Sequence, residues 1–293
     1  YEDKVARVVI RAIDLLNPEV LKAKIEENLL VKNALFEKLF EKEPLKLEDI
    51  YQKYLDYGQR LKERIIDSEL EINKGIDEGK SVLFEGAQAL MLDIDFGTYP
   101  YVTSSSPTTG GVCVGAGVPP TKLKNLIGVS KAYCTRVGNG PFPTELHDEL
   151  GEQIRQIGFE FGASTGRPRR TGWLDLVALR HACMINGITH LVITKLDVLT
   201  GIDKIKVCTA YKTEDGKIID YFTSSTTKLE LYEAQYEELE GWTEDISKIS
   251  TFDELPKTAQ DYIHFIENYL GIEVYLVSVG PERSQNIIRT TLF

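Results

Sequence analysis

Long hydrophobic runs are absent from this sequence of 293 residues. No stretch approaches the about 20 uninterrupted apolar residues that a membrane-spanning helix requires. The first residues, Tyr1-Glu2-Asp3-Lys4, have neither the basic start nor the apolar segment of a signal peptide. We therefore expect a cytoplasmic protein with no membrane partner.

Patterns typical of metal sites are also absent. The four cysteines are spread over the sequence, each more than about 20 residues from the next, so they form no CxxC pair. The four histidines show neither HxxxH nor HExxH spacing. We predict no zinc site, no histidine-centred nucleophile and no metal ligand in this chain.

Basic residues are in deficit, with 34 Lys and Arg against 45 Asp and Glu and a net charge of −11. Such a balance disfavours a nucleic-acid partner, because binding to a phosphate backbone requires a basic face. An anionic ligand must then be met by a local basic cluster. The clearest candidate is Arg167-Pro168-Arg169-Arg170.

The sequence pattern changes near residue 80, which predicts a helical subdomain over residues 1–80 and an α/β core over residues 81–293. The first part has long Glu-, Lys- and Leu-rich stretches, which predict helices from Pro18 to Lys42 and from Leu47 to Lys74. The second part has short apolar runs between Gly- and Pro-rich loops, which predict a mostly parallel sheet with flanking helices. The expected strands are 82–84, 126–129, 190–193, 205–208 and 274–277, and the expected helices are 174–185 and 259–269.

The segment Thr194-Lys195-Leu196-Asp197 follows an apolar run and is a candidate guanine-reading site. In open α/β sheets, ligands bind at the carboxyl ends of the strands. An Asp carboxylate there can accept hydrogen bonds from the ring N–H and the exocyclic amine of guanine, while the Lys stem lies along the base. The alternative, which four residues alone leave open, is a surface lysine beside a helix-capping aspartate.

A GTP site normally includes a phosphate-binding loop, and the nearest match is GIDEGKS over residues 75–81. This segment is one residue shorter than GxxxxGK[ST]. It also follows a predicted helix and precedes a predicted strand, which is the reverse of the order that points helix amides at phosphate. We therefore reject it as a phosphate-binding loop, and with it the interpretation as a GTPase switch protein.

The segment GASTGRPRRTGW (residues 162–173) places hydroxyls, a permissive glycine and three guanidinium groups on one loop before a helix. Arginine forks bind carboxylates and phosphates through paired hydrogen bonds, and Ser and Thr hydroxyls add neutral donors. Clustered arginines repel one another unless an anion lies among them. We therefore interpret the loop as an anion site, with pairing to the protein's own acidic surface as the alternative.

Long polar loops between residues 84 and 111 indicate another part of a site, because loops of this length are usually functional. Gln88 offers both a donor and an acceptor, which suits a purine or a developing oxyanion; a structural amide is the alternative. The turn at residues 278–281 is a weaker candidate, since its backbone can close over a base.

Taken together and in order, these segments resemble the adenylosuccinate synthetase family. The resemblance spans essentially all 293 residues. It implies a phosphate-loop NTPase-like synthetase fold without its first strand or strands. It also implies a GDP-forming ligase of purine biosynthesis that joins IMP and L-aspartate with GTP and Mg²⁺, as a homodimer. The segments are YEDKVAR (1–7), FEGAQ (84–88), DIDFGTYPYVTSS (93–105), TRVGNGPFPTEL (135–146), GASTGRPRRTGWLDL (162–176), TKLDVL (194–199) and SVGPER (278–283).

The resemblance also implies roles for individual residues. Gln88 would face the reacting side of the IMP base and is the one catalytic residue implied for this chain. Arg7 would reach the IMP phosphate held by the other subunit. The implied IMP contacts are Arg7, Gln88, Thr103, Val137 and Arg167; the implied aspartate contacts are Ser164, Thr165, Arg167 and Arg169; and the implied GTP contacts are Arg169, Lys195, Asp197, Ser278 and Gly280.

One departure from the family decides the expectation for this chain. The family's GDEGKGK loop is not among these 293 residues, and with it are missing the aspartate that acts as base and binds Mg²⁺ and the histidine that assists phosphoryl transfer. We expect the chain, taken alone, to be an inactive C-terminal portion of such a synthetase, with the Mg²⁺ ligands in the other part. The alternative is a non-catalytic guanine-nucleotide-binding or dimerisation module.

Overall fold

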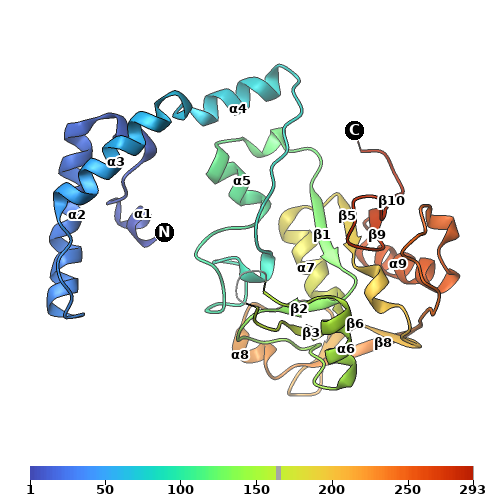
Figure 1. Ribbon diagram of the computed structural model, residues 1–293. Coiled ribbons are helices and arrows are strands. Elements are labelled where there is room, and N and C mark those ends of the chain that lie inside the picture. Colours follow the sequence, from blue (N-terminus) through green and yellow to red (C-terminus); the bar gives the residue numbers. More distant parts are fainter. Residues whose placement is uncertain (163–165, 293) are drawn as a thin grey trace. The chain divides into compact units, whose positions relative to one another are not determined.

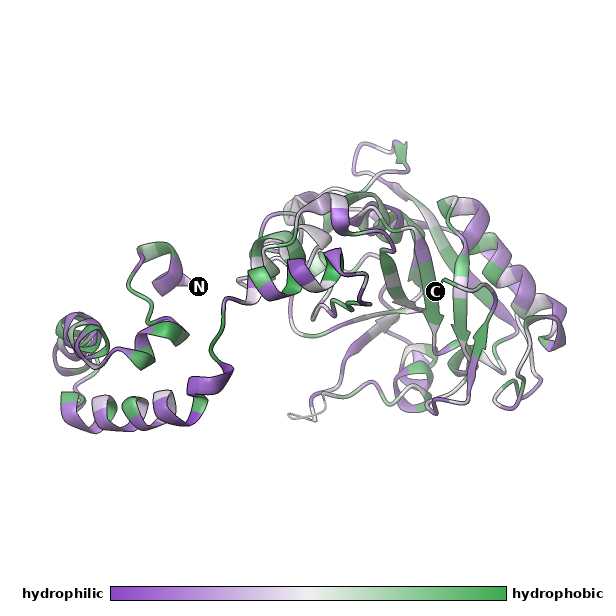
Figure 2. Ribbon diagram, turned by 90° about the horizontal axis from the view of Figure 1, so that it is seen from above, coloured by the Kyte–Doolittle hydropathy of each residue, from purple (hydrophilic) through white to green (hydrophobic). Residues whose placement is uncertain are grey.

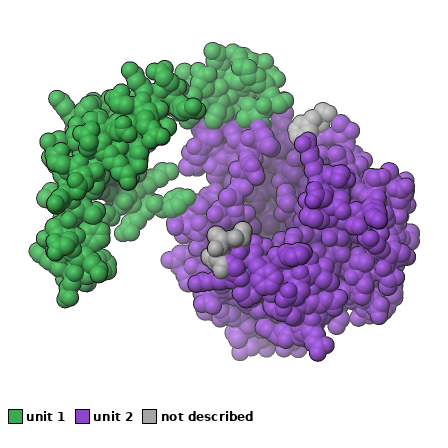
Figure 3. Space-filling model, viewed as in Figure 1, with its two compact units in different colours: residues 1–82 green, residues 83–293 purple. Residues whose placement is uncertain are grey.

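The computed structural model describes residues 1–162 and 166–292, and it divides into two compact units, Tyr1–Val82 and Leu83–Phe293 (Figure 3). In the hydropathy colouring, hydrophobic residues concentrate on the strands of the second unit and alternate with polar residues on the helices of the first (Figure 2). That the units are separate domains, with the boundary which the sequence places after residue 80, stays a prediction.

The first unit is helical in its described residues. Its second helix begins where the Asn17 side chain accepts a hydrogen bond from the Val20 amide (3.2 Å), with Pro18 in the first turn. Gly58 lies so close to Leu15 that a Cβ would be 2.3 Å from the Leu15 carbonyl oxygen, so only glycine fits there. The elements are α1 (Glu2–Ala6), η1 (Ala12–Leu16), α2 (Pro18–Lys38), α3 (Leu47–Leu61), η2 (Lys62–Arg64) and α4 (Ser68–Asp77).

The predicted continuous helix from Leu47 to Lys74 is wrong in its middle. Helix α3 ends at Leu61 and α4 starts at Ser68, with Ile65 between them in an extended conformation (φ −90°, ψ 110°). The β-branched Ile65 and Ile66 disfavour a continuous helix, and the Asp67-Ser68 pair that follows favours the start of a new one.

A four-stranded sheet forms the centre of the second unit, in the order β1-β5-β9-β10 (Figure 1). Strands β1 (Ile127–Lys131), β5 (His190–Thr194) and β9 (Val274–Ser278) are parallel, and β10 (Asn286–Ile288) pairs antiparallel with β9. The parallel strands therefore end at one edge of the sheet. The predicted α/β class with a parallel sheet and flanking helices is confirmed, as are the four predicted strands from residue 126 onward.

Two smaller sheets and several helices complete the second unit. Helix α7 starts two residues later than predicted because the Asp175 carboxylate accepts a hydrogen bond from the Ala178 amide (2.9 Å) and caps it. The strands are β2 (Cys134–Arg136), β3 (Arg170–Gly172), β4 (Leu174–Asp175), β6 (Lys204–Lys212), β7 (Ile218–Ile219) and β8 (Glu233–Glu240). The helices are α5 (Thr109–Ala116), α6 (Glu149–Ile157), α7 (Leu176–Asn186), α8 (Thr226–Leu229) and α9 (Lys257–Leu270), with 3-10 turns η3 (Leu90–Leu92), η4 (Pro120–Lys122), η5 (Leu196–Leu199) and η6 (Phe252–Glu254).

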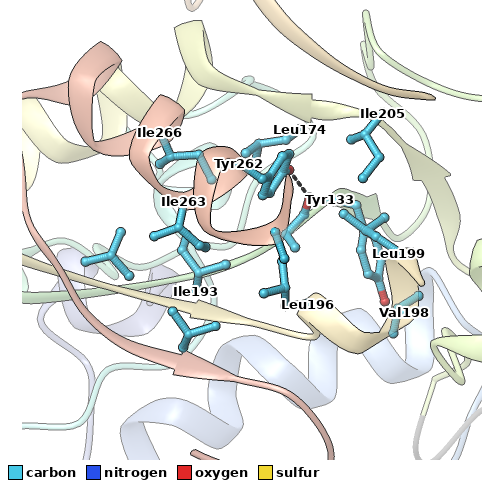
Figure 4. Close-up of a cluster of buried hydrophobic side chains, with 14 of the residues drawn as sticks. Tyr133, Leu174, Ile193, Leu196, Val198, Leu199, Ile205, Tyr262, Ile263 and Ile266 are labelled. Atoms are coloured by element: carbon cyan, nitrogen blue, oxygen red, sulfur yellow. Dashed lines mark hydrogen bonds between the residues drawn. The ribbon is translucent and has the colours of Figure 1, made fainter. Parts of the chain in front are cut away.

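Helix α9 and the parallel strands enclose the main hydrophobic core (Figure 4). Ile263 and Ile266 of α9 are fully buried with Ile193 of β5. The buried Tyr262 hydroxyl donates a hydrogen bond to the Ala132 carbonyl (2.5 Å), just after β1 ends. This core therefore fixes the carboxyl ends of β1 and β5 against α9.

The predicted strand 82–84 is not formed. In the described residues this segment pairs with no strand, and Leu83 exposes 84% of its surface. A short apolar run becomes a strand only where a neighbour supplies ladder hydrogen bonds, which sequence alone does not show. Across residues 1–162 and 166–292, no helix is both long and apolar enough to cross a membrane.

Candidate nucleotide and substrate site

Polar residues follow each of the three parallel strands at the shared carboxyl edge. Lys131 ends β1 and lies opposite Thr194, the last residue of β5. Ile193 of β5 pairs with Val277 of β9, so the segments that start at Lys195 and at Ser278 leave the sheet side by side. This edge is where open α/β sheets hold their ligands.

Lys195 turns the chain sharply after β5. Its φ of 60° is in the left-handed region, and it immediately precedes the 3-10 turn η5, which contains Asp197. The Lys195 ammonium donates a hydrogen bond to the Gly158 carbonyl and lies 3.3 Å from a carboxylate oxygen of Glu160. The lysine is thus held by the loop that follows α6, and it is not a freely moving surface side chain.

Asp197 has a buried carboxylate oxygen, Oδ1, that accepts no hydrogen bond from the part of the chain that the structure describes. Burial raises the pKa of this carboxyl, Lys195 lowers it and Asp245 raises it, with a net rise. A buried acceptor without a donor is costly unless a ligand supplies one. The helix-capping alternative for Asp197 does not account for this oxygen.

The turn after β9 closes beside the same edge. The Ser278 hydroxyl donates a hydrogen bond to the Gly280 carbonyl (2.9 Å). A Cβ at Gly280 would come within 2.3 Å of the Gln285 side chain, whose amide nitrogen donates to the Ser247 carbonyl (2.9 Å). Gly280 therefore leaves room for the Gln285 amide, and the pairing of β5 with β9 places the segments that carry Lys195 and Ser278 side by side.

A fully buried carboxylate, Glu160, gathers three cations beside this edge. Its two oxygens lie 2.8 Å from the Lys131 ammonium, and its Oε2 accepts a hydrogen bond from Arg169 (2.6 Å). Its Oε1 accepts a hydrogen bond from the buried Tyr133 hydroxyl (2.6 Å) and faces Lys195. Sequence reasoning missed Glu160, Lys131 and Tyr133. The available signal was the polar Lys131 at the end of an apolar strand.

Burial alone would raise the pKa of the Glu160 carboxyl, but hydrogen bonds from Lys131, Tyr133 and Arg169 outweigh it and lower the pKa to about 2. Burial lowers the pKa of Lys131 against the opposing effect of Glu160, and Arg169 and Lys195 add to the lowering. The Glu160 carboxylate therefore keeps its negative charge over the whole pH range in which proteins are normally folded.

Glu160→Gln is expected to remove stability that depends on pH. Because the folded pKa of about 2 lies below the ordinary value of 4.5, the carboxylate stabilises the fold above pH 4.5 and loses this contribution as the pH falls towards 2. The shift corresponds to about 3 kcal/mol at most. Denaturant unfolding at neutral and acid pH measures it: the gap between wild type and variant should narrow as the pH falls. A gap that is independent of pH would contradict this role.

The arginine loop is closed at its base by backbone hydrogen bonds. The Arg169 amide donates to the Glu160 carbonyl (2.9 Å), and the Gly162 amide donates to the Arg167 carbonyl (2.8 Å). Arg167 is exposed. The predicted aspartate contacts Ser164 and Thr165 lie outside the described residues.

Arg169 and Arg170 of the loop are ion-paired with the protein's own carboxylates. Arg169 pairs with Glu160, and Arg170 pairs with Glu145 through both guanidinium nitrogens of its fork. For Arg170 the alternative interpretation, a basic residue that pairs within an acidic protein, accounts for the contact. Arg169 keeps 29% of its side chain exposed and can still meet a ligand.

Arg136 connects two of the predicted IMP-binding segments. Its guanidinium donates to the Thr98 hydroxyl (2.8 Å) and to the Tyr101 carbonyl (3.4 Å), two residues before Thr103. Val137, which follows Arg136, is exposed. The predicted ribose and phosphate contacts therefore lie on segments that touch each other.

Gln88 lies in the second unit, where no described contact joins it to the other candidates, and Arg7 lies in the first unit. Gln88 is exposed and has a φ of 64°. Arg7 is exposed at the end of α1 in the first unit, with a φ of 65°. Their roles stay predictions.

Among the described residues, no three His, Cys, Asp or Glu side chains converge to hold a metal ion. At the carboxyl edge, Glu160 is ion-paired with Lys131, Arg169 and Lys195, and Asp197 belongs to no group of three such side chains among the described residues. These donors do not fit a Mg²⁺ centre, and we assign no chemical step of this chain to a metal.

The parallel sheet with its basic and acidic carboxyl edge defines an α/β protein of the class that holds nucleotides and anionic substrates at strand ends. A family model described as adenylosuccinate synthetase matches residues 1–287. The chain belongs to the adenylosuccinate synthetase family, a family of GDP-forming ligases.

Individual relatives support this assignment. The chain is 53% identical over 291 residues to the adenylosuccinate synthetase of Geobacillus sp. (strain WCH70), covering 99% of this chain and 68% of that protein. It is 54% identical over 285 residues to the enzyme of Listeria monocytogenes serotype 4a, covering 97% and 66%. The solved structure of fully ligated adenylosuccinate synthetase from Plasmodium falciparum has a TM-score of 0.92 and 41% identity, covering 99% and 68%. The chain thus spans about two thirds of the length of these relatives, and the resemblance read from the motifs is confirmed.

Proposed function

We propose that these residues form the base-reading and substrate-binding part of an enzyme that ligates IMP and L-aspartate, with GTP, to adenylosuccinate. The observation that supports this most is the buried Oδ1 of Asp197, which receives no hydrogen bond within the described residues and lies beside Lys195 at the sheet edge. In a chain of this family, guanine supplies the N–H donors that this oxygen lacks. Below, the complete enzyme means a polypeptide that carries residues 1–293 together with the family's GDEGKGK segment.

The proposed reaction has two steps. A base removes the N1 proton of IMP, O6 attacks the γ-phosphorus of GTP and GDP leaves. The aspartate nitrogen then attacks C6 and displaces phosphate, which gives adenylosuccinate. The base is the aspartate of the GDEGKGK segment, where the Mg²⁺ on which the family depends would also bind.

Residues of this chain bind and orient the substrates. Asp197 and Lys195 read guanine, with Ser278 and Gly280 closing the base pocket. Gln88 orients the IMP base, while Thr103, Val137 and the Arg7 of a second subunit hold its ribose and phosphate. Arg167, Arg169, Ser164 and Thr165 hold the aspartate carboxylates, with Arg167 also serving IMP and Arg169 also serving GTP. The proposal includes a homodimer in the cytoplasm.

A non-catalytic guanine-nucleotide-binding or dimerisation module is the second candidate. The same unpartnered oxygen of Asp197 supports nucleotide binding in either case. Turnover separates the two: a module binds GTP but forms no adenylosuccinate even when it is joined to the GDEGKGK segment.

Arg167→Leu in the complete enzyme tests the substrate assignment. The change removes a guanidinium fork proposed to bind the aspartate carboxylate, so the KM for aspartate should rise about 100-fold, the effect of losing a charge-assisted hydrogen bond. The KM for GTP should change less than about threefold, within the range of a surface substitution. Steady-state assays with each substrate varied in turn measure both values.

Arg170→Leu is the matched control for this experiment. Its guanidinium is paired with Glu145, so the variant should lower thermal stability without changing the ratio of the two KM values. Equal losses for aspartate and GTP in Arg167→Leu would refute the assignment of the loop to aspartate.

A further inference from the structure

One buried carboxylate contacts cations from three separate parts of the second unit. Lys131 comes from the end of β1, Arg169 from the loop before β3, and Lys195 from the turn after β5. Glu160 itself precedes the arginine loop and has no exposed side-chain surface. Three elements that are distant in sequence therefore meet at a single negative charge.

The anionic side chain of this cluster is fully buried, whereas its three cationic side chains are partly exposed. The Glu160 side chain is 0% exposed, whereas the side chains of Lys131, Arg169 and Lys195 are 25%, 29% and 36% exposed. The anion lies inside and the cations extend from it towards the surface. Each cation therefore has exposed surface that a ligand can contact, while its buried side is held by Glu160.

The charges of this cluster do not cancel. Three cations share one carboxylate. Among the described residues, its other hydrogen-bond donor is the neutral, buried Tyr133 hydroxyl. Positive charges that surround one carboxylate repel one another, so without the Glu160 charge the three side chains would move apart. With it, a net positive charge remains at the sheet edge where anionic substrates would bind.

We propose that Glu160 is the positioning residue that sets Lys195, on the guanine side of the site, and Arg169, on the dicarboxylate side, with a single carboxylate. The two substrate pockets are then not independent, because both depend on the same buried group. This inference rests on the proposed function, which assigns Lys195 to GTP and Arg169 to aspartate and GTP.

Glu160→Gln in the complete enzyme tests the inference. Glutamine keeps the shape and one acceptor but removes the charge, so Lys195 and Arg169 lose their common anchor. The KM values for GTP and for aspartate should each rise about tenfold, the size of one weakened charged contact. The KM for IMP should change less than about twofold, because none of the three cations is assigned to IMP.

A double-mutant cycle adds a measure that a structural role would not change. Lys195→Met should raise the KM for GTP less in the Glu160→Gln background than in the wild type, since the lysine has already lost its anchor. Glu160→Asp keeps the charge on a shorter stem and should restore part of both KM values. That variant also keeps the test open if Glu160→Gln folds poorly.

Glu267→Gln is the matched control. Glu267 is a partly buried carboxylate that pairs with Arg289 and accepts a hydrogen bond from the Val274 amide, at the opposite end of β9 from the site. This variant should lose stability with all three KM values unchanged.

The outcomes separate the inference from the proposed function. Unchanged KM values for GTP and aspartate in a folded Glu160 variant, or additive effects of Glu160→Gln and Lys195→Met, would overturn the role of Glu160. Failure of the wild-type complete enzyme to form adenylosuccinate would overturn the proposed function instead. In that case, equilibrium binding of GDP to the same variants still tests whether Glu160 positions Lys195.

Discussion

Asp197→Asn is expected to change the nucleotide preference of the complete enzyme from GTP to XTP. In the proposed complex the carboxylate accepts from the ring N–H and the exocyclic amine of guanine, whereas an amide presents one acceptor and one donor. Xanthine has an acceptor, O2, where guanine has its amine, so the amide suits xanthine and opposes guanine. A buried site that loses its matching donors and acceptors discriminates strongly, and we expect kcat/KM for GTP to fall by about 10²–10³-fold.

The measurement compares kcat/KM for GTP and XTP in wild type and variant. Asp245→Asn is the control, because Asp245 is an exposed carboxylate that acts electrostatically on Asp197 and has no proposed ligand contact. This control should keep the preference for GTP. An Asp197→Asn variant that still prefers GTP would show that Asp197 does not read the base.

Residues 1–293 assayed alone are expected to form no GDP from GTP, IMP and aspartate. Phosphoryl transfer depends on positioning the phosphates and neutralising their charge, and arginines and lysines at the sheet edge cannot replace a phosphate-binding loop and a metal site. Turnover should be at least about 10⁴-fold below that of the complete enzyme, since the base, the loop and the metal ligand act together. A GDP-release assay at equal protein concentration measures this difference.

Nucleotide binding provides the control for that experiment. If residues 1–293 bind GDP, as judged by equilibrium dialysis, but do not turn over, the base-reading and chemical parts of the enzyme are separable. GDP formation by these residues alone would contradict the assignment of the chemistry to the GDEGKGK segment.

The sequence was sufficient for the parts of the fold that depend on local pattern. The buried strands β5 and β9 are runs of apolar residues that end in polar turns, and both were predicted within one residue of their observed bounds. Segment 82–84 has the same pattern but forms no strand, because a strand depends on a neighbouring strand, which is often distant in the sequence. The break between α3 and α4 was missed because the apolar residues keep a helical spacing on both sides of the short extended segment.

Prediction of the site was limited in a similar way. Lys195 and Asp197 could be proposed from the sequence because they follow an apolar strand within four residues. Glu160 was not, because nothing around it in the sequence indicates a buried carboxylate. Its negative charge is stabilised by hydrogen bonds from Lys131, Tyr133 and Arg169, which only the folded chain brings together.

The fate of the IMP oxygen tests the account most directly. IMP labelled with ¹⁸O at position 6 is incubated with the complete enzyme, GTP and L-aspartate, and the products are analysed by mass spectrometry. If O6 attacks the γ-phosphorus and aspartate then displaces phosphate, one ¹⁸O atom appears in each phosphate released, and adenylosuccinate carries none. Label that stays with the nucleotide, or the absence of adenylosuccinate, would contradict the proposed ligation.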